Sequence, residues 1–171
     1  YFNSLVWTGS GNYQREINLG KFLPDFIWIK NRFSTVSHTI YDSIRGYGDN
    51  KILHSDVANS ESAGGASGYI LSTSSSNNSL KFSGSSTSGN DLYYTDRTGD
   101  QFSAWCWKAG GAPSGTTATN GSAMIDGDAQ KVDDIYANST GADLKPDLMS
   151  VSTKAGFSII KVSFSNTASA V

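Results

Sequence analysis

The segment QFSAWCWKAGG, residues 101–111, is the most informative about the fold of this 171-residue chain. Side chains alternate along a strand, so Ala104 and Cys106 share one face while Trp105 and Trp107 share the other. Both faces are apolar, which is typical of a central strand buried on both sides. We therefore expect a strand in the middle of a sheet, with Cys106 as a small buried side chain rather than a reactive thiolate.

Similar strand-forming segments lie on both sides of this stretch. The segment 22–32 (FLPDFIWIKNR) is apolar on both faces and predicts a second central strand, with Pro24 at its start. A polar turn at Asn77 and Asn78 separates two alternating runs and predicts a hairpin. The full set of expected strands covers residues 1–9, 22–32, 37–46, 68–73, 79–84, 101–111 and 156–164, with 51–55 as a short strand or turn.

Composition agrees with an all-β chain, because 18 glycines accompany 12% aromatic residues and few helix-forming stretches. We predict an antiparallel β-sandwich of jelly-roll type with long loops, formed by residues 1–155. Residues 112–150 are poor in large side chains and predict a loop-rich insertion with one minor hairpin turning at 126–128. Residues 156–171 are either a closing strand of the sandwich or the first strand of a following tandem domain, since they repeat the layout of residues 1–11.

Charge and hydropathy exclude several classes of protein. The net charge is −2, only 16% of the residues are charged, and no basic run is present, which argues against nucleic-acid binding. No apolar run approaches the roughly 18 residues that a membrane span needs. A single cysteine excludes an internal disulfide.

Several blocks in a fixed order resemble one known domain. They are YFNSLVWTG (1–9), PDFIWIKNR (24–32), YDSIRG (41–46), AWCWKAGG (104–111) and AGFSII (155–160). Together they resemble a concanavalin A-like lectin/glucanase sandwich of tailed-phage structural proteins, especially tail-fibre and appendage proteins of marine and cyanobacterial phages. The resemblance does not extend to residues 112–150.

The resemblance implies a non-enzymatic module of a phage virion, located in a tail fibre or another extracellular appendage. Its expected partners are further copies of itself in a homotrimer, other virion proteins, and a polysaccharide of the host cell surface. A secreted or surface-displayed bacterial lectin-like adhesin is the alternative, and a glycan hydrolase is a third reading.

The residues offer little for catalysis. A glycan hydrolase needs two carboxyl groups flanking the scissile bond, whereas Glu16 and Glu61 are the chain's two glutamates and neither has a carboxylate within three positions. His38 and His54 are the available bases for a nucleophilic triad, and no GxSxG motif accompanies them. We expect no enzyme.

Ligand binding has a better candidate in the polar segment before residue 101. Exposed aromatic rings can stack on sugar rings while amide, carboxyl and guanidinium groups bond the hydroxyls, and this segment holds Tyr93, Tyr94, Asn90, Asp91, Asp96 and Arg97. The tryptophans at strand positions (Trp7, Trp28, Trp105 and Trp107) are expected in the core or in a subunit interface.

Two acidic features invite a functional reading, but a structural role is preferred for both. Carboxylates can bind Ca²⁺, and the weak candidates for such a site are Asp126, Asp128, Asp133 and Asp134. We prefer a role for these residues in a hairpin turn, and we expect no cofactor. In YDSIRG, we expect Asp42 and Arg45 to form an ion pair at the end of a strand, followed by Gly46 with positive φ.

Overall fold

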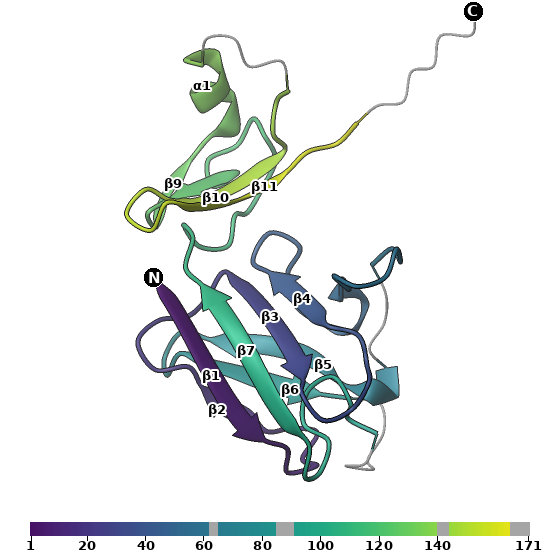
Figure 1. Cartoon of the computed structure of the whole chain (residues 1–171). Coiled ribbons are helices and arrows are strands. Elements are labelled where there is room, and N and C mark those ends of the chain that lie inside the picture. The colour runs from purple at the N-terminus through teal and green to yellow at the C-terminus, as the bar shows by residue number, and fades with distance from the viewer. Residues whose placement is uncertain (62–64, 85–90, 140–143, 165–171) are drawn as a thin grey trace, which may run out of the picture.

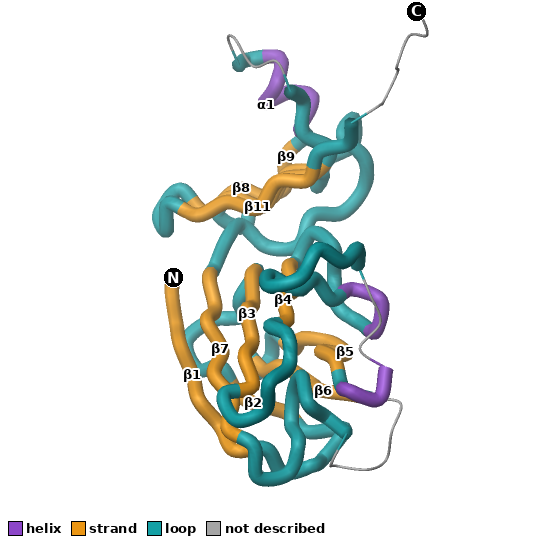
Figure 2. The backbone as a smooth tube through the Cα atoms, turned by 45° about the vertical axis from the view of Figure 1, so that its right-hand side comes forward, coloured by secondary structure: helices purple, strands orange, loops and turns teal. Residues whose placement is uncertain are grey.

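A computed structural model of the chain describes residues 1–61, 65–84, 91–139 and 144–164, which form three sheets (Figures 1 and 2). The first sheet has the order β1 (Phe2–Thr8), β7 (Gln101–Trp107), β3 (Phe26–Asn31), β4 (Thr39–Asp42). The second has the order β2 (Glu16–Asn18), β6 (Ser79–Ser83), β5 (Tyr69–Ser74). The third has the order β11 (Phe157–Lys161), β10 (Leu148–Ser152), β8 (Ala123–Ile125), β9 (Asp128–Gln130).

Helical structure is scarce. The described residues contain two short 3-10 helices, η1 (Asp49–Lys51) and η2 (Gly65–Ser67), and one α-helix, α1 (Val132–Ala137). None of these helices is long and apolar enough to cross a membrane. The predicted all-β class is therefore confirmed.

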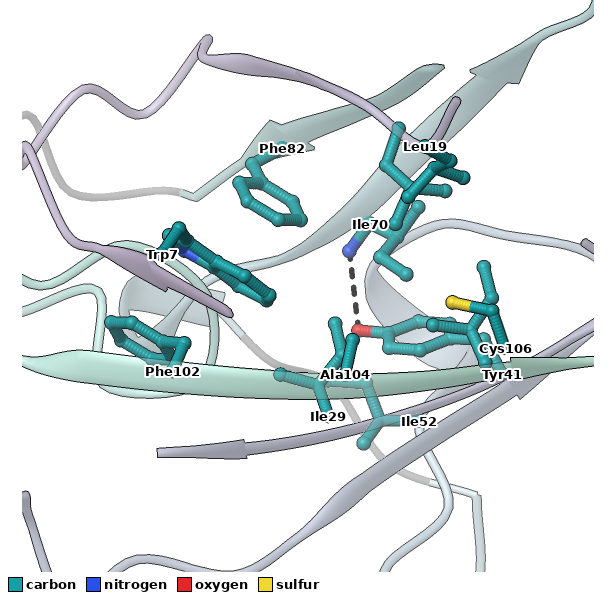
Figure 3. Close-up of a cluster of buried hydrophobic side chains, with 12 residues drawn as sticks. Trp7, Leu19, Ile29, Tyr41, Ile52, Ile70, Phe82, Phe102, Ala104 and Cys106 are labelled. Carbon is teal, nitrogen blue, oxygen red and sulfur yellow. Dashed lines mark hydrogen bonds between the residues drawn. The ribbon is translucent and has the colours of Figure 1, made fainter. Parts of the chain in front are cut away.

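The first and second sheets pack face to face and form the predicted sandwich. Trp7 from β1 stacks on Phe102 from β7 with 5.3 Å between ring centroids, and lies 5.7 Å from Phe82 of β6 in the opposite sheet (Figure 3). The hydroxyl of Tyr41 on β4 accepts a hydrogen bond of 3.2 Å from the backbone N–H of Ile70 on β5, so a polar contact also joins the layers. The jelly-roll assignment within this class stays a prediction.

The stretch 101–111 forms a central strand, as expected, because β7 lies between β1 and β3 and pairs with both in antiparallel register. Ala104 and Cys106 point into the core and are fully buried. Trp105 and Trp107 point outward and stay only partly buried. The expectation of burial on both faces is therefore wrong for the outer face, since the second sheet covers only the inner one.

Residues 112–150 contain more regular structure than the loop-rich insertion that the sequence predicts. The expected hairpin is present, because β8 and β9 turn at Asp126 and Gly127, which both have positive φ. The short helix α1 and most of β10 follow it. β10 pairs with β8 in parallel, which departs from a purely antiparallel arrangement and is possible because β9 and α1 lie in the long connection between the two strands.

The strand predicted at 156–164 is β11, which pairs with β10 in an antiparallel hairpin instead of lying beside β1. β11 therefore belongs to the third sheet, and this sheet lies next to the sandwich (Figure 1). Gly110 fixes the junction, because a Cβ atom at this position would lie 1.9 Å from the carbonyl oxygen of Met124. The backbone N–H of Gly110 donates to the hydroxyl of Ser150 over 3.1 Å.

Candidate functional site

Aromatic side chains gather on the outer face of the first sheet. The antiparallel register places Trp105 of β7 opposite Trp28 of β3, and their rings meet edge to face with centroids 5.9 Å apart. One row along, Trp107 lies opposite both Phe26 and Phe2. Its ring centroid is 4.9 Å from that of Phe2 and 5.5 Å from that of Phe26. Five rings from three strands thus form one continuous surface.

A loop after β3 forms a wall beside this surface. The indole N–H of Trp28 donates a hydrogen bond of 2.8 Å to Nδ1 of His38, and the two rings are 5.6 Å apart. The ammonium group of Lys30 donates to the backbone carbonyl of Val36 over 2.6 Å, which fastens the loop to the strand. The backbone N–H of His38 is bound in turn by a carboxylate oxygen of Asp56 at 3.1 Å.

The third sheet closes one end of the surface. Phe157 at the start of β11 stacks on Trp107 with 6.0 Å between ring centroids, and meets Phe26 edge to face at 5.9 Å. An aromatic side chain from a separate sheet therefore lies across the end where β7 leaves the sandwich. The other end, towards Lys30 on β3, is not covered by the third sheet (Figure 1).

We call this surface the aromatic groove and define it by Phe2, Phe26, Trp28, His38, Trp105 and Trp107. Its central hollow, lined by Trp28, His38, Trp105 and Trp107, has a volume of about 420 Å³. Ligand sites in proteins commonly have volumes of roughly 300–1,000 Å³ and are lined by apolar and aromatic side chains with a few polar groups. The groove is therefore large enough for a sugar ring or a short chain of them.

The tyrosine segment predicted as a ligand site is largely occupied with internal contacts. The guanidinium group of Arg97 lies 4.4 Å from the centre of the Tyr93 ring. Tyr94 packs against the core, and its ring centroid is 5.4 Å from that of His54. Asp91 is half-buried, and Asn90 lies outside the described residues.

Asp96, another residue of that predicted site, is completely buried. Its carboxylate accepts hydrogen bonds of 2.8 Å from Arg15 and 2.7 Å from Ser10. It therefore holds the segment against the turn that follows β1. The structure brings Tyr93 and Arg97 together but turns Asp96 inward.

The acidic residues considered for calcium are spread over the third sheet and its helix. Asp126 accepts hydrogen bonds from Ser152 and Thr153 and thereby links two turns. Asp133 pairs with Lys145, and Asp128 and Asp134 are exposed. Within the described ranges, no group of three or more histidine, cysteine, aspartate or glutamate side chains is arranged to hold a metal ion.

Two other side chains that could take part in chemistry, a thiol and a carboxylate, have structural roles instead. Burial raises the pKa of the Cys106 thiol to about 12, so the predicted role as a buried side chain agrees with its environment. Glu61 pairs with Arg45 and Lys51.

The predicted ion pair between Asp42 and Arg45 is present at 2.6 Å. It lies at the end of β4, as the sequence indicates. Gly46 follows with φ of 81°. The structural reading of YDSIRG is therefore confirmed.

The aromatic groove was not among the predicted sites, because tryptophans in strands are expected in cores or interfaces. Trp7 follows that expectation and is 8% exposed. One signal in the sequence could have revealed the groove: Lys30 shares a face of its strand with Trp28, and a charged side chain marks a face that reaches solvent.

The protein is thus a β-sandwich with an aromatic groove on the outer face of one sheet. The chain belongs to the family described as "Domain of unknown function (DUF7483)", whose sequence model matches residues 1–171. No curated protein and no solved structure matches the chain.

Proposed function

We propose that this domain is a non-enzymatic, glycan-binding module of an extracellular phage appendage, and that the aromatic groove holds the glycan. The single observation that carries the glycan-binding part is the row of partly exposed tryptophan rings on the outer face of the first sheet. The placement in a phage appendage depends on the resemblance of the sequence blocks described above. A surface-displayed bacterial adhesin would use the same groove, and the neighbouring genes would distinguish the two.

The physical chemistry of sugars favours such a surface. One face of a pyranose ring presents C–H groups, which pack on the flat face of an indole and bury apolar area without desolvating hydroxyls. Trp105 and Trp28 meet edge to face at the middle of the groove. Polar groups beside them, at Ser103, Lys30 and His38, can bond the hydroxyls at the ring edge.

Weak binding of this kind suits an appendage that carries several copies of the domain. Each additional copy that engages the same surface binds at a high effective concentration, so that modest single-site affinity gives firm attachment. A homotrimeric fibre would supply three such sites. The mechanism that we propose is therefore repeated, shallow recognition rather than a deep, high-affinity pocket.

A glycan array tests the proposal with the unmodified chain and the variants Trp105→Ala and Trp28→Ala. The matched control is Ile160→Ala, since this side chain is 49% exposed on β11 and lies on a different sheet. We expect both tryptophan variants to lose binding by about tenfold or more, while Ile160→Ala retains it. Circular dichroism verifies that each variant is folded.

Two results would contradict the proposal. One is retention of all glycan signals by both tryptophan variants. The other is a combination of two findings: the protein binds no glycan on the array, and light scattering shows a concentration-dependent dimer or trimer that Trp105→Ala disrupts. The second result would identify the groove as a subunit interface.

A further inference from the structure

Building on the proposed function, we infer that the ligand of the aromatic groove is an anionic polysaccharide, whose acidic groups are held by Lys30 and Arg32. Neither the family description nor the resemblance assigns a charge to the ligand. The inference depends on the distribution of charge along the groove.

Lys30 lies on the outer face of β3, two residues from Trp28, so the two side chains occupy neighbouring rows of the same face. Its ammonium group donates one hydrogen bond, to the carbonyl of Val36. A lysine ammonium has three N–H donors, which leaves donors for an acidic ligand at the wall of the groove. In the described part of the chain, no carboxylate forms an ion pair with Lys30.

Arg32 extends the positive charge beyond the end of β3. It is exposed, and with Val6 and Gln101 it lines a second hollow of about 430 Å³ at the open end of the groove. Among the described residues, no acidic side chain is paired with this guanidinium group either. Arginine binds carboxylate and sulfate oxygens with two parallel N–H groups, which suits an ester sulfate or a uronate.

Negative charge is scarce on the same face. Along the strands of the first sheet, the outward acidic side chain is Asp42, which is 6% exposed and neutralised by Arg45. At the wall, the exposed carboxylate of Asp56 accepts a hydrogen bond from the backbone N–H of His38. The whole chain has a net charge of −2, with 15 acidic and 13 basic residues, so two cations at one end of a groove that form no ion pair with any described residue are an uneven distribution. Clefts lined by one sign of charge attract ligands of the opposite sign.

The two ends of the groove therefore differ in chemistry. Phe157 closes one end, tryptophans line the middle, and Lys30 and Arg32 stand at the open end. A polysaccharide can stack its rings in the middle and extend its acidic groups to the cations as it leaves. Neutral glycans would keep the stacking but lose the charged contacts.

Biolayer interferometry with four immobilised polymers tests this arrangement: alginate, dextran sulfate, neutral dextran, and a single-stranded oligothymidylate as an anion without accessible pyranose rings. The variants are Lys30→Met and Arg32→Gln, which keep most of the side-chain volume. Lys131→Met is the control, because Lys131 at the N-cap of α1 is also exposed and lies outside the first sheet. Trp105→Ala is added to report on stacking.

We expect alginate or dextran sulfate to bind about tenfold or more tightly than dextran. Raising NaCl from about 50 to about 500 mM should weaken this binding, because salt screens exposed charges. Lys30→Met and Arg32→Gln should each weaken it several-fold and Lys131→Met should not. Preference for alginate identifies carboxylate as the recognised group, and preference for dextran sulfate identifies sulfate.

The outcomes separate this inference from the proposed function. Equal binding of dextran and both anionic polysaccharides, lost in Trp105→Ala, would overturn the inference and keep the groove as a glycan site. Binding of oligothymidylate as tightly as alginate would overturn the inference in favour of nucleic acid. Binding of an anionic polysaccharide that Trp105→Ala and both cation variants leave unchanged would contradict both proposals.

Discussion

The indole N–H of Trp28 donates to Nδ1 of His38 over 2.8 Å, which couples the floor of the aromatic groove to its wall. An imidazole nitrogen can accept this bond only when it carries no proton. Neutral His38 therefore carries its proton on Nε2. The bond fixes the plane of the Trp28 ring against which a ligand would stack.

Replacing His38 with leucine removes this acceptor, whereas His38→Asn keeps an oxygen close to the position of Nδ1. We expect His38→Leu to lower the free energy of unfolding by about 1 kcal/mol, because the partly buried indole N–H loses its partner. It should also weaken glycan binding, with His38→Asn closer to the unmodified chain on both measures. Urea denaturation gives the first quantity and the glycan array the second; identical behaviour of the two variants would contradict the role of the bond.

Tyr41 joins the two layers of the sandwich through its hydroxyl group (Figure 3). Burial raises the pKa of Tyr41 well above its usual range, so the hydroxyl stays neutral at every pH at which the protein is handled. In Tyr41→Phe, the buried N–H of Ile70 would lack its acceptor, and we expect a loss of about 1–3 kcal/mol in the free energy of unfolding. The comparison is Tyr47→Phe, which removes a longer bond of 3.4 Å to the carbonyl of Pro24 and should cost less.

Cys106 provides a pH-dependent test of the core. Its thiol has a pKa raised to about 12 by burial, against 9.0 for an ordinary cysteine, so a disulfide reagent at neutral pH meets almost no thiolate and no open path. We expect Cys106 to react only after unfolding, with a rate that follows the unfolded fraction as urea rises. The same shift makes the folded state lose stability as the pH rises from 9.0 towards about 12, because only the unfolded thiol ionises there. Rapid labelling of the native protein at neutral pH would show that this strand is not buried.

Gly110 tests how the third sheet is attached. In Gly110→Ala, the new methyl group would lie 1.9 Å from the carbonyl oxygen of Met124 and 2.6 Å from that of Val151. The backbones must separate, at a cost of about 1–3 kcal/mol for overpacking. We expect faster hydrogen exchange in β8 and β10 and little change in β3, measured by mass spectrometry; Ala112→Ser, at an exposed position nearby, is the control. Unchanged exchange in the third sheet would contradict the role of Gly110.

The sandwich could be predicted because its strands alternate clearly and large apolar side chains mark them. β10 was missed for a physical reason: the positions that alternate inward are Ser150 and Ser152, which are buried because each bonds a backbone group of the adjacent turn or junction. β2 has only three residues, and its pairing with β6 is a tertiary contact. The helix α1 has Lys131 at its N-cap and forms no side-chain capping bond, so no start signal precedes it.

The candidate site was harder to predict than the fold. Alternation showed that Trp105 and Cys106 face opposite sides of β7, but not which side the second sheet covers, because both sides are apolar. The smaller side chains face inward, where Tyr41 and Trp7 fill the space between the sheets. Stacking of Phe157 on Trp107 joins residues 50 positions apart through a contact between sheets, which no local pattern contains.

Indole N–H resonances report directly on whether a glycan occupies the aromatic groove. Each of the four tryptophans contributes one indole N–H to a two-dimensional ¹⁵N spectrum, and Trp7 serves as an internal reference, because its N–H is buried and donates to the carbonyl of Thr95. On titration with the glycan that binds best on the array, our account predicts shifts of the Trp28, Trp105 and Trp107 peaks and no shift of Trp7. A bound glycan that leaves the three outer peaks unmoved would contradict it.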